Sequence, residues 1–173
     1  MTDFSVIKDF VREHIKNSEK KLSDSDAIFE DENYCSFETS NGNFIHVTLK
    51  PDDDEIVLMG VLGVLPNSDN IEGDDVERKS LEAESDQFRI MQFFMRTNLE
   101  LSDAENTSFA YYEEYIVLQR KIPLSGLSKS EFEKSVYVFV EDLELWMGGF
   151  ASVLKQVKSD AQNLVLNSNL VFA

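Results

Sequence analysis

Few side chains in this sequence have the types and the spacing that catalysis requires. The 173 residues include two histidines, His14 and His46, and one cysteine, Cys35. Neither histidine has a carboxylate and a nucleophile at an obvious spacing, and Cys35 falls on the inward face of a predicted strand, where a buried thiol is inert. The sequence contains no phosphate-binding glycine loop, nucleophile elbow or HExxH motif. We therefore predict no catalytic residue and no cofactor, and so a protein that is not an enzyme.

Two acidic clusters supply the oxygen ligands that calcium prefers. Residues 52–55 (DDDE) occupy a predicted tight turn, and residues 69–75 (DNIEGDD) surround a glycine. Neither cluster has the alternating acidic residues, central glycine and twelfth-position glutamate of a calcium-binding loop. The sequence therefore predicts no metal site.

The net charge restricts the partners that the surface can attract. Asp and Glu number 33 against 16 Lys and Arg, which gives a formal net charge of −17. Such a surface repels nucleic acids and anionic membranes and attracts a basic partner, although solubility alone is the alternative explanation. The single cysteine, the absence of a secretory signal and the lack of a membrane-length apolar run favour a cytoplasmic protein.

Hydrophobic periodicity predicts the elements of the first half of the chain. Residues 3–22 carry the apolar stripe of a helix, and residues 27–32 are expected to be extended. Residues 34–39 and 44–49 alternate between apolar and polar side chains. They are predicted to form a hairpin around Asn41-Gly42, because both of these residues tolerate positive φ.

The second half contains an acidic insertion, a hairpin and a long helix. Residues 66–86 are polar and acidic, and their first part reads as a mobile loop. A helix is expected to begin near Val76 or Leu81. Residues 106–112 and 115–122 are predicted to form a hairpin that ends at a proline. A capping box at residues 128–131 (SKSE) then predicts the start of an amphipathic helix over residues 129–158.

These elements predict an α+β fold in the order α-β-β-β-α-β-β-α. We expect one domain over residues 1–158, built on an antiparallel twisted sheet packed by helices. The acidic insertion at about residues 66–86 interrupts this domain, and residues 159–173 form a C-terminal extension without a clear pattern.

Two segments are more apolar than one small sheet with covering helices requires. Residues 56–65 (IVLMGVLGVL) are predicted to form a strand, and residues 87–99 (QFRIMQFFMRTNL) a helix that is apolar around much of its circumference. Either all of these side chains belong to the core, or some of them contact another chain. The candidate residues for a homodimer interface are Phe88, Met91, Phe94 and Met95.

The order of elements and the last hairpin resemble the class I type III secretion chaperones, which include the Tir chaperone family. The matching pieces extend over about residues 3–157. They are Asn98-Leu99 at a helix end, residues 109–112 and 115–118 in the hairpin, residues 122–128 (IPLSGLS) in the turn, and Trp146. The longer insertion and the C-terminal extension depart from the family pattern.

The resemblance implies a bacterial, cytoplasmic homodimer that works without ATP. Such a protein binds an extended N-terminal segment of a secreted effector and keeps it stable and competent for export. The secretion ATPase of the export apparatus is a further implied partner, whereas nucleic acid and membrane insertion are not expected. The alternative is a regulatory or stress-response protein of the same fold, similar to the YbjN group, with no secreted client.

The candidate contacts for such a client are aromatic side chains and a histidine on the outward sides of predicted elements. Aromatic rings are good anchors because they bury a large area with few rotatable bonds. Phe10 and Phe44 could instead pack within their own chain. The candidate client-binding residues are Phe10, Tyr34, Phe44 and His46.

Overall fold

The chain alternates helices with runs of strands. The computed structural model describes residues 4–17, 27–31, 33–39, 41–66, 76–101 and 107–171. The elements are, in order, α1 (Phe4–Asn17), β1 (Ala27–Asp31), β2 (Tyr34–Glu38), β3 (Phe44–Lys50), the short 3-10 helix η2 (Pro51–Asp53), β4 (Glu55–Val64), α2 (Val76–Leu101), β5 (Thr107–Tyr112), β6 (Tyr115–Pro123) and α3 (Lys129–Val171).

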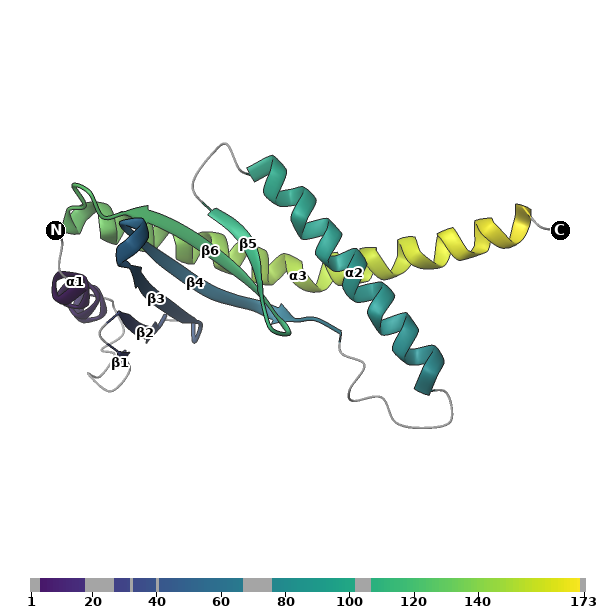
Figure 1. Ribbon diagram of the computed structural model, residues 1–173, viewed down its shortest axis with the longest axis horizontal. Helices are drawn as coiled ribbons and strands as arrows, with labels where there is room; N and C mark the ends of the chain where they lie inside the picture. The colour runs from purple at the N-terminus through teal and green to yellow at the C-terminus, as the bar shows by residue number, and fades with distance from the viewer. Residues whose placement is uncertain are drawn as a thin grey trace.

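The strands form one six-stranded antiparallel sheet in the order β1-β2-β3-β4-β6-β5 (Figure 1). The predicted α+β class and the antiparallel sheet are confirmed. Residues 27–31, predicted only to be extended, pair with β2 as an edge strand, so four strands rather than three precede α2. The predicted Asn41-Gly42 turn joins β2 to β3, with Gly42 at a φ of 84°.

The helices all pack toward one face of the sheet, which we call the inner face. α3 lies along β4 and β6, α1 contacts β2 and α3, and α2 contacts β5 and α3 (Figure 1). Alternate strand residues point to this face and form a single core with the helices. The largest fully buried side chains of this core are Phe37, Phe94, Phe132, Phe139, Ile7, Ile45, Ile56, Leu58, Ile90, Ile116, Leu118 and Leu143.

The start of α3 is fixed by the predicted capping box. The Glu131 backbone N–H donates a hydrogen bond to Ser128 Oγ at 3.3 Å, and the Ser128 N–H donates to Glu131 Oε2 at 2.8 Å. The Ser128 hydroxyl, which donates to Glu131 Oε2 at 2.7 Å, and the Ser128 N–H together lower the pKa of Glu131. The preceding turn is anchored to the sheet, because the Leu124 N–H donates to the Asp54 carbonyl at 2.9 Å. The direction of α3 across the sheet therefore follows from the turn that precedes it.

Two glycines in β4 allow α3 to lie close to the sheet. A Cβ at Gly60 would lie 2.5 Å from Leu143 Cδ2, and a Cβ at Gly63 would overlap the Phe150 ring. A side chain at either position would push α3 outward. Residues 60 and 63, which suggested a strand in the sequence, thus also set the distance between helix and sheet.

One predicted helix boundary is confirmed and another was wrong. α2 begins at Val76, which is one of its two predicted starts, so it includes the second half of the acidic insertion, whereas residues 67–75 lie outside the described residues. α3 continues to Val171 instead of ending near Lys158, and no proline or glycine between residues 150 and 171 provides a stop signal. Although α3 has 43 residues, neither it nor any other helix in the described ranges combines the length and apolar character of a membrane span.

We predict opposite effects for alanine at two glycines. Gly60→Ala should lower the free energy of unfolding by about 1–3 kcal/mol, because the new methyl group overlaps the buried Leu143 side chain. Gly148→Ala should raise it by about 1 kcal/mol, because a Cβ there meets no atom within 4 Å and alanine favours the helix. Urea unfolding measures both changes. A neutral Gly60→Ala variant would contradict the close packing of α3 on β4.

Candidate functional site

The face of the sheet away from the helices, which we call the outer face, carries an apolar groove. The register places Tyr34 level with Thr48 and Val57, and His46 level with Met59 and Gln119. A groove of about 700 Å³ crosses this face from β2 to the β5–β6 hairpin. Its lining residues are Tyr34, His46, Thr48, Met59, Gly60, Val61, Tyr112, Tyr115 and Val117. Its middle is aliphatic and its two ends are aromatic.

One end of the groove is fixed by a hydrogen bond between Tyr34 and His46. Tyr34 Oη lies 2.5 Å from His46 Nδ1, and the two rings stack with centroids 5.9 Å apart and an interplanar angle of 24°. The residues come from adjacent strands, so the sheet register brings them together. A bonded and stacked pair of rings presents a rigid surface to a ligand.

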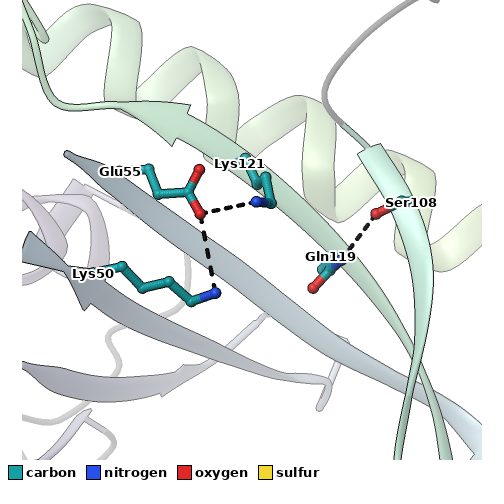
Figure 2. Close-up of polar contacts among 5 residues, drawn as sticks. All are labelled: Lys50, Glu55, Ser108, Gln119 and Lys121. Carbon is teal, nitrogen blue, oxygen red and sulfur yellow. Dashed lines mark hydrogen bonds and ion pairs between the residues drawn. The ribbon is translucent and has the colours of Figure 1, made fainter. Parts of the chain in front are cut away.

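The polar side chains beside the groove are largely paired with one another. Glu55 Oε1 lies 3.0 Å from Lys121 Nζ and 4.0 Å from Lys50 Nζ, and Gln119 donates to Ser108 at 3.0 Å (Figure 2). Glu55 thereby offsets the positive charge at this margin of the outer face. The aliphatic middle of the groove is bordered by polar groups whose bonds are made within the sheet.

α2 is apolar on two opposite sides. Ile90 and Phe94 are fully buried and pack toward β5 and α3. On the opposite side, residues spaced by seven, seven and four positions form a straight exposed line, which we call the α2 stripe. The stripe consists of Leu81, Phe88, Met95 and Leu99, with exposed fractions of 67%, 61%, 61% and 79%. The structure thus explains why the sequence of this helix is apolar around so much of its circumference.

The four candidate interface residues divide between these two sides. Phe88 and Met95 lie on the exposed α2 stripe. Phe94 is fully buried in the core, and Met91 is half-buried against it, with its carbonyl accepting a hydrogen bond from the Tyr111 hydroxyl at 2.9 Å. The structure therefore places only Phe88 and Met95 where a second chain could reach them.

The four candidate client contacts are also divided. Tyr34 and His46 line the groove, and Phe44 lies on the same face, 49% exposed, two positions along β3 from His46. Phe10 is half-buried and packs against Phe132, with ring centroids 5.8 Å apart. Phe10 thus makes the intramolecular contact that the sequence left as its alternative.

Sequence reasoning missed the rest of the groove. Met59, Val61 and Val117 belong to strands whose apolar runs do not indicate which side faces the core, and Tyr112 and Tyr115 flank a turn. The predicted hairpin of β5 and β6 was an available signal for Tyr112 and Tyr115. These two residues flank its turn and are directly paired across it. Their position relative to Tyr34 depends on the pairing of β4 with β6, which no local pattern specifies.

The β5 edge of the sheet is closed by a side chain of α2. Asn98 Nδ2 donates to the Phe109 carbonyl at 2.8 Å, and the Phe109 N–H donates to Asn98 Oδ1 at 2.6 Å. The carboxamide thus takes the place of a neighbouring strand at this residue. The other edge of the sheet is β1.

The remaining candidates for chemistry lie apart from the groove. Burial raises the pKa of the Cys35 thiol from 9.0 to about 12, an effect that Lys8 and Arg12 reduce only in part. Among the described residues, no group of three or more His, Cys, Asp or Glu side chains could hold a metal ion. The acidic cluster at residues 69–75 and the side chain of His14 lie outside what the structure describes.

Several solved structures share this fold. The chain is similar to the HopA1–SchA chaperone–effector complex (TM-score 0.53, 14% identity, 83% of this chain and 91% of the other). It is also similar to the ExsC–ExsE complex (0.50, 13%, 85% and 95%). A third similar structure is the Yersinia pestis type III secretion chaperone SycH in complex with a stable fragment of YscM2 (0.50, 14%, 84% and 99%).

The family follows from the sequence itself. Residues 13–147 match the model of the Tir chaperone protein (CesT) family, and the chain belongs to that family. A search of curated proteins found no match. At such low identities the similar structures establish a shared fold, and the family resemblance predicted from the sequence is confirmed.

We predict that Cys35 is unreactive in the folded protein. Its side chain is buried and its pKa of about 12 keeps the thiol protonated at pH 8, while only the thiolate reacts rapidly with a disulfide reagent. Ellman's reagent at pH 8 should label the native protein slowly and the protein in 6 M guanidinium at once, with one thiol per chain. Rapid labelling of the native protein would contradict the buried position.

Proposed function

We propose that this protein is a type III secretion chaperone, which binds an N-terminal segment of a secreted effector and keeps it stable and export-competent. Membership of the Tir chaperone family supports the class of function. The observation that carries the proposal is the apolar groove on the outer face, which is lined by Met59, Val61 and Val117 and bounded by aromatic rings.

The groove favours binding through side chains. The middle strands that line it, β3, β4 and β6, are each paired on both sides, so their main-chain groups are committed to the sheet. A segment lying across them gains mainly from burying its apolar side chains. Full burial of three or four such side chains contributes on the order of 5–10 kcal/mol, before the entropy that association costs.

An extended part of the same client could pair with the sheet edge at β1. An exposed edge strand offers main-chain donors and acceptors to an added strand, which is a common mode of peptide recognition. Asn98 closes the opposite edge at Phe109, which supports β1 as the preferred side. Groove contacts and edge pairing together would hold the client without a globular fold, as export requires.

We further propose that the protein acts as a cytoplasmic homodimer formed through the α2 stripe. Its four exposed apolar side chains extend over about 27 Å of helix, and packing two such stripes together would remove them from water. In this assembly the loaded dimer would be the form presented to the secretion ATPase of the export apparatus.

We predict that charges on the α2 stripe separate the dimer without unfolding the chain. In the variant Phe88→Glu/Met95→Glu each carboxylate would be buried in an apolar interface, at a cost of several kcal/mol. Sedimentation equilibrium at about 100 μM should show a dimer for the wild type and a monomer for the variant. Leu145→Glu, at an exposed leucine of α3, is the matched control and should stay dimeric. A wild-type monomer at this concentration contradicts the proposal.

We also predict that a charge in the groove weakens client binding. Tagged wild-type protein should retain an effector from a lysate of its own organism, identified by mass spectrometry and then bound again as a purified N-terminal segment. Val61→Glu should weaken this binding at least tenfold, because the carboxylate would be desolvated beneath apolar side chains. Leu145→Glu should bind as the wild type does. Equal binding by both variants would exclude the groove as the client site. A wild type that binds no effector in the absence of ATP would contradict the proposed chaperone function.

A further inference from the structure

The end of the groove at the β5–β6 hairpin differs from the aliphatic middle. Tyr112 and Tyr115 are a directly opposed cross-strand pair, and Tyr112 is 63% exposed. The turn between them is Glu113-Glu114, and both residues are exposed. The two tyrosines that line this end of the groove are thus joined by two exposed acidic residues.

The charges around the groove favour a cationic occupant. None of the nine described residues that line it is Lys or Arg. The two lysines at the far margin, Lys50 and Lys121, both form ion pairs with Glu55. The chain as a whole has a net charge of −17. A positively charged side chain thus meets attraction at the hairpin end.

We infer that the groove selects a client segment in which an Arg or Lys side chain packs over Tyr112 and Tyr115, while apolar neighbours of that residue lie over Met59, Val61 and Val117. This inference rests on the proposed function and specifies the chemistry of the client. A cation over the face of a tyrosine ring is attracted by the negative potential of the ring. The negative charges of Glu113 and Glu114 would attract the same cation.

A wholly apolar segment would fit this end poorly. It would take water from the tyrosine hydroxyls and the two turn carboxylates without replacing their hydrogen bonds, and such desolvation opposes binding. An Arg guanidinium can cover an aromatic ring while its N–H groups face the carboxylates. The groove therefore matches an apolar segment that has a basic residue at one end.

The register indicates how far apart the two kinds of contact are. Tyr34 is level with Val57 through Thr48, and Tyr115 is level with Val64. These positions on β4 are roughly 20 Å apart at about 3.3 Å per residue. A single side chain cannot reach both aromatic ends. The basic residue is therefore assigned to the hairpin end, and the Tyr34–His46 pair bounds the apolar part.

A selection from a displayed library of random 16-residue peptides tests this inference. Wild-type protein should enrich peptides in which Arg or Lys adjoins a run of aliphatic residues. For the best peptide, replacing its basic residue by Gln should weaken binding to the wild type about fivefold to thirtyfold, the range expected for a cation–aromatic contact assisted by charge. The probe in each binding measurement is this selected peptide or its Gln form.

Three variants locate the contact. Tyr112→Leu keeps an apolar side chain but removes the ring, and it should show a smaller preference for the basic peptide, because Tyr115 and the two carboxylates remain. Tyr112→Phe keeps the ring and should retain the preference for the basic peptide. Tyr137→Leu is the matched control, because Tyr137 is 62% exposed on α3, and it should behave as the wild type does.

The outcomes separate this inference from the proposed function. Selected peptides without a basic residue, or a Tyr112→Leu variant that prefers the basic peptide as strongly as the wild type does, would overturn the inference and leave the chaperone proposal standing. If the wild type selects no peptide and also retains no effector, both fail. If it retains an effector whose binding segment has no Arg or Lys, only the inference fails.

Discussion

The contact between α3 and β4 is the constraint on which the rest of the structure depends. Gly60 and Gly63 let Leu143 and Phe150 reach the strand backbone, so that one helix lies directly on the middle of the sheet. α1 and α2 then pack against both α3 and the sheet on the same side (Figure 1). The core is complete on the inner face alone. The outer face carries further apolar side chains, of which Phe44 and Val61 are exposed.

The same one-sided arrangement gives α2 its two roles. Ile90 and Phe94 attach the helix to the core, and Asn98 bonds the β5 backbone at Phe109. Because that side packs against the core, the α2 stripe on the opposite side remains exposed. The structure thus separates two apolar surfaces, the groove on the sheet and the stripe on the helix. A client and a second copy of the chain could bind at the same time without competing for one site.

Local patterns predicted much of the fold and little of the groove. The capping box at Ser128 and the Asn41-Gly42 turn depend on neighbouring residues, so the sequence alone located them. The pairing of β4 with β6 determines which side chains of β6 share a face with Tyr34. These two strands are separated in the sequence by the whole of α2. Periodicity could not assign Phe88 and Phe94 to opposite sides, because α2 is apolar on both. The end of α3 was missed because no residue there stops a helix.

Methyl NMR with labelled methionine tests the central claim most directly, because three of the methionines lie on separate surfaces. Met59 lies in the groove, Met95 on the α2 stripe and Met147 on α3. Adding the effector segment recovered with the protein should shift the Met59 methyl resonance and leave those of Met95 and Met147 unchanged. A segment that binds with equal affinity but shifts Met95 or Met147 and not Met59 would contradict the account.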